Sequence, residues 1–142
     1  MTELVILVAA AATMIWLGMV LAISFLEAPL KFRAEGLELQ VGLAIGRIVF
    51  RALNIAEVAW AVVIALCLTI AGPSGPVLVL AAVTAVLLAV QLLLVRPRLS
   101  QRSARVLAGH DAPRSRAHHA YIGLDALKLA ALVALGAALL AG

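Results

Sequence analysis

Residues 4–26 read LVILVAAAATMIWLGMVLAISFL, a run of apolar and small uncharged residues. A helix needs about 20 such residues to cross the hydrocarbon core of a bilayer. The run is too long for the apolar core of a typical signal peptide, and Glu3 precedes it instead of Lys or Arg. The sequence therefore predicts a retained transmembrane helix over about residues 4–26.

The remainder of the chain is similarly apolar. Of its 142 residues 65% are hydrophobic, and the mean hydropathy is +1.17. That composition leaves too little polar surface to cover a water-soluble domain. Further spanning helices are predicted over about residues 41–71, 77–95 and 118–141. We therefore expect a single all-α membrane domain, residues 1–142, built as a polytopic bundle of four transmembrane helices.

The connections between these helices differ sharply in charge. Residues 72–76 read GPSGP, a strong turn signal without charge, whereas residues 27–40 and 96–117 carry or adjoin every Lys and Arg except Lys128. Basic connections stay on the cytoplasmic side of a membrane. The sequence thus predicts two cytoplasmic connections, both termini outside (N-out/C-out), and a location in the inner (plasma) membrane.

The net charge of +4 could indicate a nucleic-acid partner, but the basic residues flank apolar runs. That placement favours anionic lipid headgroups, and no nucleic acid is expected. The residues predicted to contact headgroups are Arg96, Arg98, Arg102 and Arg105.

Several polar side chains fall within the predicted spans, where an ionisable group costs about 2.5–3.5 kcal/mol on insertion scales. Their helical spacing places them on shared faces in the cytoplasmic half of the bundle. The candidate residues for a ligand or ion site are Glu27, Arg51, Asn54, Glu57, Gln91, Tyr121, Asp125 and Lys128. We expect them to form one cluster in which Lys128 and Arg51 neutralise some of the carboxylates. The same cluster could instead serve only to hold the helices together.

The sequence contains no nucleophile motif or glycine-rich phosphate loop, so no catalytic residue is predicted. His118 and His119 are weak candidates for a metal, because adjacent side chains on a helix point about 100° apart. No metal site and no cofactor are therefore expected. Cys67 lies within an apolar run and is read as a packed hydrophobe.

Three classes of function are compatible with these features. The first is a transporter or channel-like protein with a cytoplasm-facing polar cavity for an ion or small solute. The second is a non-catalytic scaffold or accessory subunit, in which the polar cluster is structural and the arginine-rich connection binds lipid or a partner. The third is a membrane enzyme that modifies a lipid or quinone. A homo-oligomer is also expected. Stripes of small residues such as Ala126, Ala130 and Ala134 would allow close packing either within the bundle or between copies.

Short motifs along most of the chain resemble one family of membrane proteins. They are Trp16-Leu17-Gly18, Phe25, Ala28-Pro29, Phe32-Arg33, Gly46-Arg47-Ile48-Val49-Phe50, Arg96-Pro97-Arg98 and His118-His119-x-Tyr121. This pattern resembles the transmembrane-protein-205-like proteins, also called domain of unknown function 4149. The resemblance implies a four-helix membrane protein without agreed catalytic residues, and a eukaryotic relative linked to platinum-drug resistance hints at transport or trafficking. Only Cys67, Met1, Met14 and Met19 could bind a soft metal, so direct platinum handling is not expected.

Overall fold

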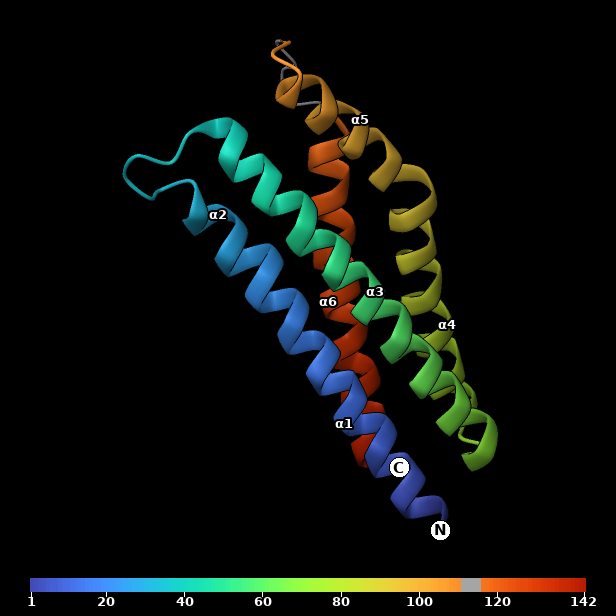
Figure 1. Cartoon of the computed structure of the whole chain (residues 1–142). Helices are drawn as coiled ribbons and strands as arrows, with labels where there is room; N and C mark the ends of the chain where they lie inside the picture. The colour runs from blue at the N-terminus through green and yellow to red at the C-terminus, as the bar shows by residue number, and fades with distance from the viewer. Residues whose placement is uncertain (111–115) are drawn as a thin grey trace.

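The computed structural model describes residues 1–110 and 116–142, and these residues form helices and short turns without any strand (Figure 1). The first long helix joins α1 (Thr2–Val20), the π-helical η1 (Leu21–Glu27) and α2 (Ala28–Lys31). The second is α3 (Leu39–Ala71). The third joins α4 (Gly75–Val90), the π-helical η2 (Gln91–Val95) and α5 (Arg96–Leu107), and the fourth is α6 (Arg116–Ala141).

All four long helices are long and apolar enough to cross a membrane. This finding confirms the predicted all-α fold and the number of candidate spans. The GPSGP turn is also confirmed: α3 ends at Ala71 and is capped by Gly72, whose positive φ of 60° is a left-handed conformation that suits glycine. The backbone N–H of Gly72 closes the helix by donating to the carbonyl of Leu68 at 3.0 Å.

Two predicted helix ends are wrong in the same way. The first helix continues past Pro29 to Lys31, and residues 96–107, which we expected in a polar connection, continue the third helix as α5. Each proline is the second residue of an α-helix that follows a π-helical stretch. Proline lacks an N–H and collides with the carbonyl four residues earlier, but a wider π turn gives that carbonyl room. Both helices therefore pass through proline instead of ending there.

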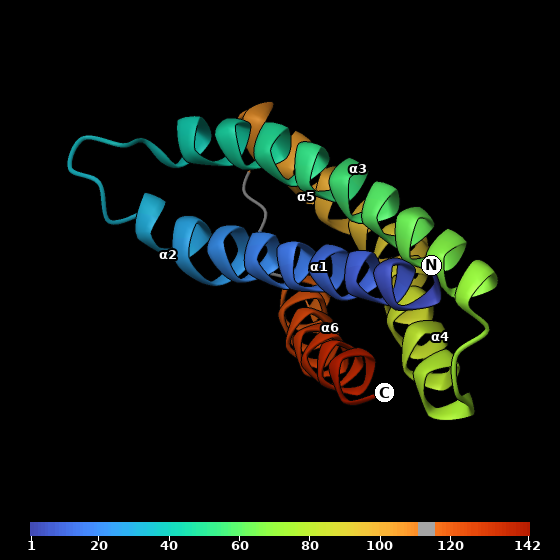
Figure 2. The ribbon, with the colours of Figure 1, turned by 90° about the horizontal axis from the view of Figure 1, so that it is seen from below.

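The four long helices pack in an unequal way. The α1 helix lies against both α3 and α6, and α6 also packs against α4 (Figures 1 and 2). The contact between α3 and α4 is much sparser, although the two helices are adjacent in the chain. Small residues bring α1 and α6 together: Ala9 and Ala12 are buried on α1, and Gly136 of α6 lies against Met14. The bundle thus is tightly packed around α1 and has a loose seam between α3 and α4.

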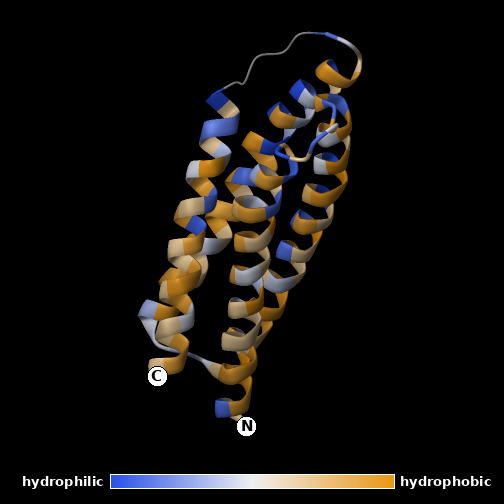
Figure 3. Cartoon of the chain, turned by 90° about the vertical axis from the view of Figure 1, so that its left-hand side faces the viewer, coloured by the Kyte–Doolittle hydropathy of each residue, from blue (hydrophilic) through white to orange (hydrophobic). Residues whose placement is uncertain are grey.

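The surface of the bundle is polarised from end to end. Both termini lie at one end, and the turn after α2 lies at the other end together with α5 (Figure 1). Hydrophilic residues gather at that second end, whereas the middle of the bundle is mainly apolar (Figure 3). We call it the arginine-rich end, because it carries Arg33, Arg98, Arg102 and Arg105. Large apolar side chains such as Ile48, Ile70 and Leu93 are more than two-thirds exposed around the bundle, as expected where lipid is the solvent.

Candidate functional site

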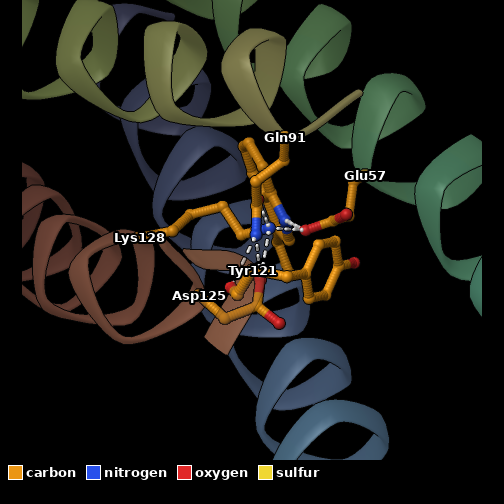
Figure 4. A network of polar contacts seen from close by, with 6 residues as sticks. Glu57, Gln91, Tyr121, Asp125 and Lys128 are labelled. Carbon is orange, nitrogen blue, oxygen red and sulfur yellow. Dashed lines mark hydrogen bonds and ion pairs between the residues drawn. The ribbon is translucent and has the colours of Figure 1, made fainter. Parts of the chain in front are cut away.

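Lys128 of α6 is the centre of a polar cluster inside the bundle. Its side chain is fully buried, with 0% of its surface exposed. The ammonium group forms an ion pair with Glu57 Oε1 and a second with Asp125 Oδ1 at 3.1 Å. It also donates a hydrogen bond of 2.6 Å to Gln91 Oε1 (Figure 4). An ammonium group has three N–H donors, so these three acceptors use all of them.

Gln91 connects the third long helix to the fourth. It is the first residue of η2, and only 1% of its surface is exposed. Its Nε2 group donates to Asp125 Oδ1 at 2.6 Å and to the backbone carbonyl of Tyr121 at 3.4 Å. Because Oε1 accepts from Lys128, both ends of the amide are engaged. Gln91 therefore bridges the charged residues without adding charge.

Trp16 brings the first helix into the same cluster. Its indole N–H donates a hydrogen bond of 3.0 Å to Glu57 Oε1, and the ring is 2% exposed. Trp16 is not among the residues predicted for the site from the sequence. The sequence feature that could have indicated Trp16 is its indole N–H in the middle of an uncharged span. A buried indole usually donates to an acceptor. With Trp16, the buried polar cluster has at least one member on each of the four long helices. Its members are Trp16, Glu57, Gln91, Asp125 and Lys128.

The local sequence explains how α6 supplies two members. Asp125 and Lys128 are separated by three residues, so their side chains lie on the same helix face one turn apart. The stripe continues with the buried Leu132 and Leu135, so the polar face passes directly into the apolar core. Apolar packing excludes water from the ion pairs, where the attraction between opposite charges is stronger than in water.

The structure brings together only part of the predicted site. Glu57, Gln91, Asp125 and Lys128 meet as expected. Tyr121 contributes its backbone carbonyl, while its ring packs edge-on against another aromatic side chain.

Glu27, Arg51 and Asn54 were wrongly placed in the cluster. Glu27 pairs with Lys31 at 3.4 Å on its own helix. Arg51 and Asn54 line a surface groove instead. A helix turns by about 100° per residue, so Arg51, six residues before Glu57, points about 120° away from it. One face of α3 therefore could not hold both residues, and Arg51 neutralises neither carboxylate of the cluster.

The buried polar cluster carries an excess negative charge. Two carboxylates face one ammonium group, which gives a formal charge of −1 when all are ionised. The second carboxylate oxygen of Glu57, Oε2, is buried and has no hydrogen-bond partner among the described residues. This oxygen is the one open acceptor that we identify in the cluster.

Two grooves open beside the cluster. One lies between α3 and α5 and includes three arginines, and the other is apolar and lies between α3 and α4. Neither groove is lined by Glu57, Gln91, Asp125 or Lys128, whereas Trp16 lines the apolar groove. Both grooves are lined on one side by α3 and on the other mainly by the third long helix.

The remaining predicted residues lie at the arginine-rich end. Arg96 is half-buried over the ring of Phe50, at 5.4 Å from the ring centroid, whereas Arg98 and Arg105 are exposed. The rings of His118 and His119 meet edge to face, with centroids 5.8 Å apart. Within residues 1–110 and 116–142, no group of three or more His, Cys, Asp or Glu could hold a metal ion.

Comparison with known proteins adds no further constraint. The chain matches no protein-family model, no curated protein and no solved structure.

Replacing Lys128 should reveal the strength of the buried polar cluster. Lys128→Met leaves both carboxylates without their cation, and breaking a buried ion pair from one side costs about 3–5 kcal/mol. We expect that loss in the free energy of unfolding, measured by denaturation in mixed micelles. Adding Glu57→Gln and Asp125→Asn should recover part of it. The matched control is Lys31→Met, whose pair with Glu27 is partly exposed and should contribute at most about 1 kcal/mol. Equal losses for both lysines would contradict the role of the cluster.

A second prediction isolates the indole hydrogen bond. Trp16→Phe keeps an aromatic ring but removes the donor to Glu57, and a hydrogen bond to a charged group contributes about 1.5–3 kcal/mol. Trp60→Phe is the control, because its N–H donates only to the weak acceptor Met19 Sδ. The Trp16 variant should unfold at clearly lower denaturant than the Trp60 variant. The reverse order would exclude Trp16 as an anchor of the cluster.

Proposed function

We propose that this protein is a small, non-catalytic membrane scaffold or accessory subunit. The observation that supports this function best is the closed pairing of Lys128, whose N–H donors all bind acceptors of the same cluster. A solute site would need donors or acceptors turned toward an open cavity, and neither groove is lined by the charged members of the cluster. The cluster is therefore suited to holding helices in register.

The proposed orientation follows from the charge distribution. Among the described Lys and Arg residues, Lys128 alone lies in the middle of the bundle, and the others lie at or near the arginine-rich end. Under the positive-inside rule this end faces the cytoplasm, and both termini face outward across the inner membrane. The resemblance to the transmembrane-protein-205-like family is compatible with this arrangement and remains part of the proposal.

The surface proposed to bind a partner is the exposed side of α5. This helix continues the third span toward the arginine-rich end, and it presents Arg98 and Arg105 outward, while Val106 is buried against the bundle. A rigid basic helix favours an acidic protein surface, because complementary charge orients the partner. The buried polar cluster would serve this function indirectly, by fixing the position of α5.

Charge reversal on α5 tests the scaffold. We expect the wild-type protein, extracted in mild detergent from its native membrane, to co-purify with a partner at fixed stoichiometry. The variant Arg98→Glu/Arg105→Glu should lose that partner, because the attraction becomes repulsion, and should retain the unfolding free energy of the wild type. The variant Arg33→Glu, at the other connection, should keep the partner. A wild-type protein that purifies alone would contradict this function.

One observation favours transport as a second candidate. The unpartnered Oε2 of Glu57 and the formal charge of −1 could attract a proton or another small cation. The two grooves lie along α3 on either side of the level of Glu57, which would be the arrangement of two half-pathways. The groove toward the termini is apolar, so a complete pathway would need polar groups from a second copy.

Measuring proton or cation uptake into proteoliposomes that contain the protein tests the transport function. Glu57→Gln together with Asp125→Asn should abolish proton or cation uptake, because the variant removes the negative charge of the cluster. Glu27→Gln, which changes a carboxylate outside the cluster, should leave uptake unaltered. Transport is rejected if the wild-type protein shows no uptake, or if the double variant retains it.

A further inference from the structure

The groove between α3 and α5, which we call the basic groove, combines positive charge with an apolar wall. It has a volume of about 770 Å³ and is open to the surface. Its lining residues are Arg47, Ile48, Arg51, Asn54, Ile55, Val58, Leu92, Arg96 and Ser100. All three charged residues in this lining are arginines, and no Asp or Glu accompanies them. The buried polar cluster contributes none of these residues.

The arginines of the basic groove lack acidic partners. Across the described residues, the ion pairs of the structure involve Lys31 and Lys128 and none of these three arginines. The charge of Arg96 is repelled by that of Arg47 and attracted, more weakly, by the Glu57 carboxylate of the buried polar cluster. Neighbouring cations in a partly apolar setting are unfavourable unless an anion lies between them. The basic groove therefore has the charge complementary to a bound anion.

One of the arginines is held in place before any ligand binds. The guanidinium group of Arg96 lies 5.4 Å from the centroid of the Phe50 ring, within the range of a cation–π contact. Phe50 in turn meets Tyr121 edge to face at 5.8 Å. This stack connects Arg96 to α3 and α6, so little side-chain freedom is lost when Arg96 binds a ligand.

The basic groove changes character along its length. Arg47 and Arg51 lie toward the arginine-rich end of α3, whereas Ile55 and Val58 lie one to two turns nearer the middle of the bundle. Leu92 of η2 faces the same apolar part from the other side of the groove. A ligand that matches both parts has an anionic head and an apolar tail.

We propose that the basic groove binds one anionic phospholipid. The phosphate binds between Arg47, Arg51 and Arg96, since a guanidinium group donates two parallel hydrogen bonds to phosphate oxygens. Asn54 and Ser100 can donate hydrogen bonds to the remainder of the headgroup. One acyl chain lies along Ile55, Val58 and Leu92.

This site is independent of the scaffold proposal, because it uses neither the buried polar cluster nor the exposed side of α5. A lipid bound there would occupy one of the two grooves that the transport candidate needs. The apolar part of the groove is the reason to favour a phospholipid over a soluble phosphate. A soluble phosphate could engage the arginines but would leave Ile55, Val58 and Leu92 without a partner.

The experiment measures lipid binding to delipidated, detergent-solubilised full-length protein by native mass spectrometry. Three probes with related chemistry are titrated: phosphatidylglycerol, phosphatidylcholine with the same acyl chains, and glycerol 3-phosphate, which has the phosphate without the chains. We expect one saturating phosphatidylglycerol per chain, weaker binding of phosphatidylcholine, and weakest binding of glycerol 3-phosphate. Glycerol 3-phosphate binding as tightly as phosphatidylglycerol would overturn the lipid assignment in favour of a soluble phosphate.

Two variants with the same change in net charge separate the basic groove from general attraction to basic residues. The groove variant is Arg47→Gln/Arg51→Gln/Arg96→Gln, and the control variant is Lys31→Gln/Arg33→Gln/Arg116→Gln. Removing three phosphate-binding arginines should weaken phosphatidylglycerol binding about a hundredfold. The control variant should change the affinity far less, because its three basic residues lie outside the groove.

Loss of the Arg96–Phe50 stack could unfold the groove variant, so the double variant Arg47→Gln/Arg51→Gln provides a second test. Both of its arginines are exposed, and their replacement should leave the unfolding free energy unchanged while still weakening binding more than tenfold. Equal weakening in the control variant, or no saturable site in the wild-type protein, would overturn the proposal.

Discussion

The ammonium group of Lys128 is the constraint on which the bundle depends. A lysine in the middle of an apolar helix cannot remain charged in lipid without partners, and a single partner would leave donors unpaired. The structure meets this demand with one acceptor for each N–H, drawn from α3, α6 and the third long helix. Trp16 of α1 donates a hydrogen bond to the carboxylate of Glu57, which also pairs with Lys128. The contacts of the buried polar cluster thereby fix the rotation and register of every long helix. Apolar packing alone would allow one helix to shift along another.

The same constraint divides the bundle into a tight and a loose part. The α1 helix packs closely on α3 and α6 around the buried polar cluster, while α3 and α4 make few contacts along their shared seam. The apolar groove lies on that seam, and the basic groove lies between α3 and the η2–α5 part of the third long helix. A ligand is therefore more easily accommodated beside the cluster than within it, since the cluster would have to break its own ion pairs first. This arrangement is why we favour a structural role for the cluster and a binding role for the grooves.

The prolines contribute to the site through the backbone. Pro97 follows η2, whose first residue is Gln91, and Pro29 follows η1 in the equivalent part of the first long helix. A π-helical stretch alters the direction of side chains relative to an α-helix and is frequent at functional positions. In the third long helix, η2 begins at Gln91, which belongs to the buried polar cluster. The same helix then continues through Pro97 as α5. Gln91 and the arginine-rich helix α5 thus belong to one continuous helix.

Much of this protein follows from its sequence. Long, mainly apolar runs predicted the four helices. The cost of burying polar groups in such helices predicted that Glu57, Gln91, Asp125 and Lys128 would face inward and meet. The tertiary structure alone decided which faces meet. Helical periodicity gives the angle between residues of one helix but not the rotation of that helix against its neighbours. Arg51 and Asn54 consequently line a groove, and Trp16 supplies the donor that no charge pattern indicated. The continuation of helix through Pro29 and Pro97 likewise depended on π-helical geometry, which local preference does not reveal.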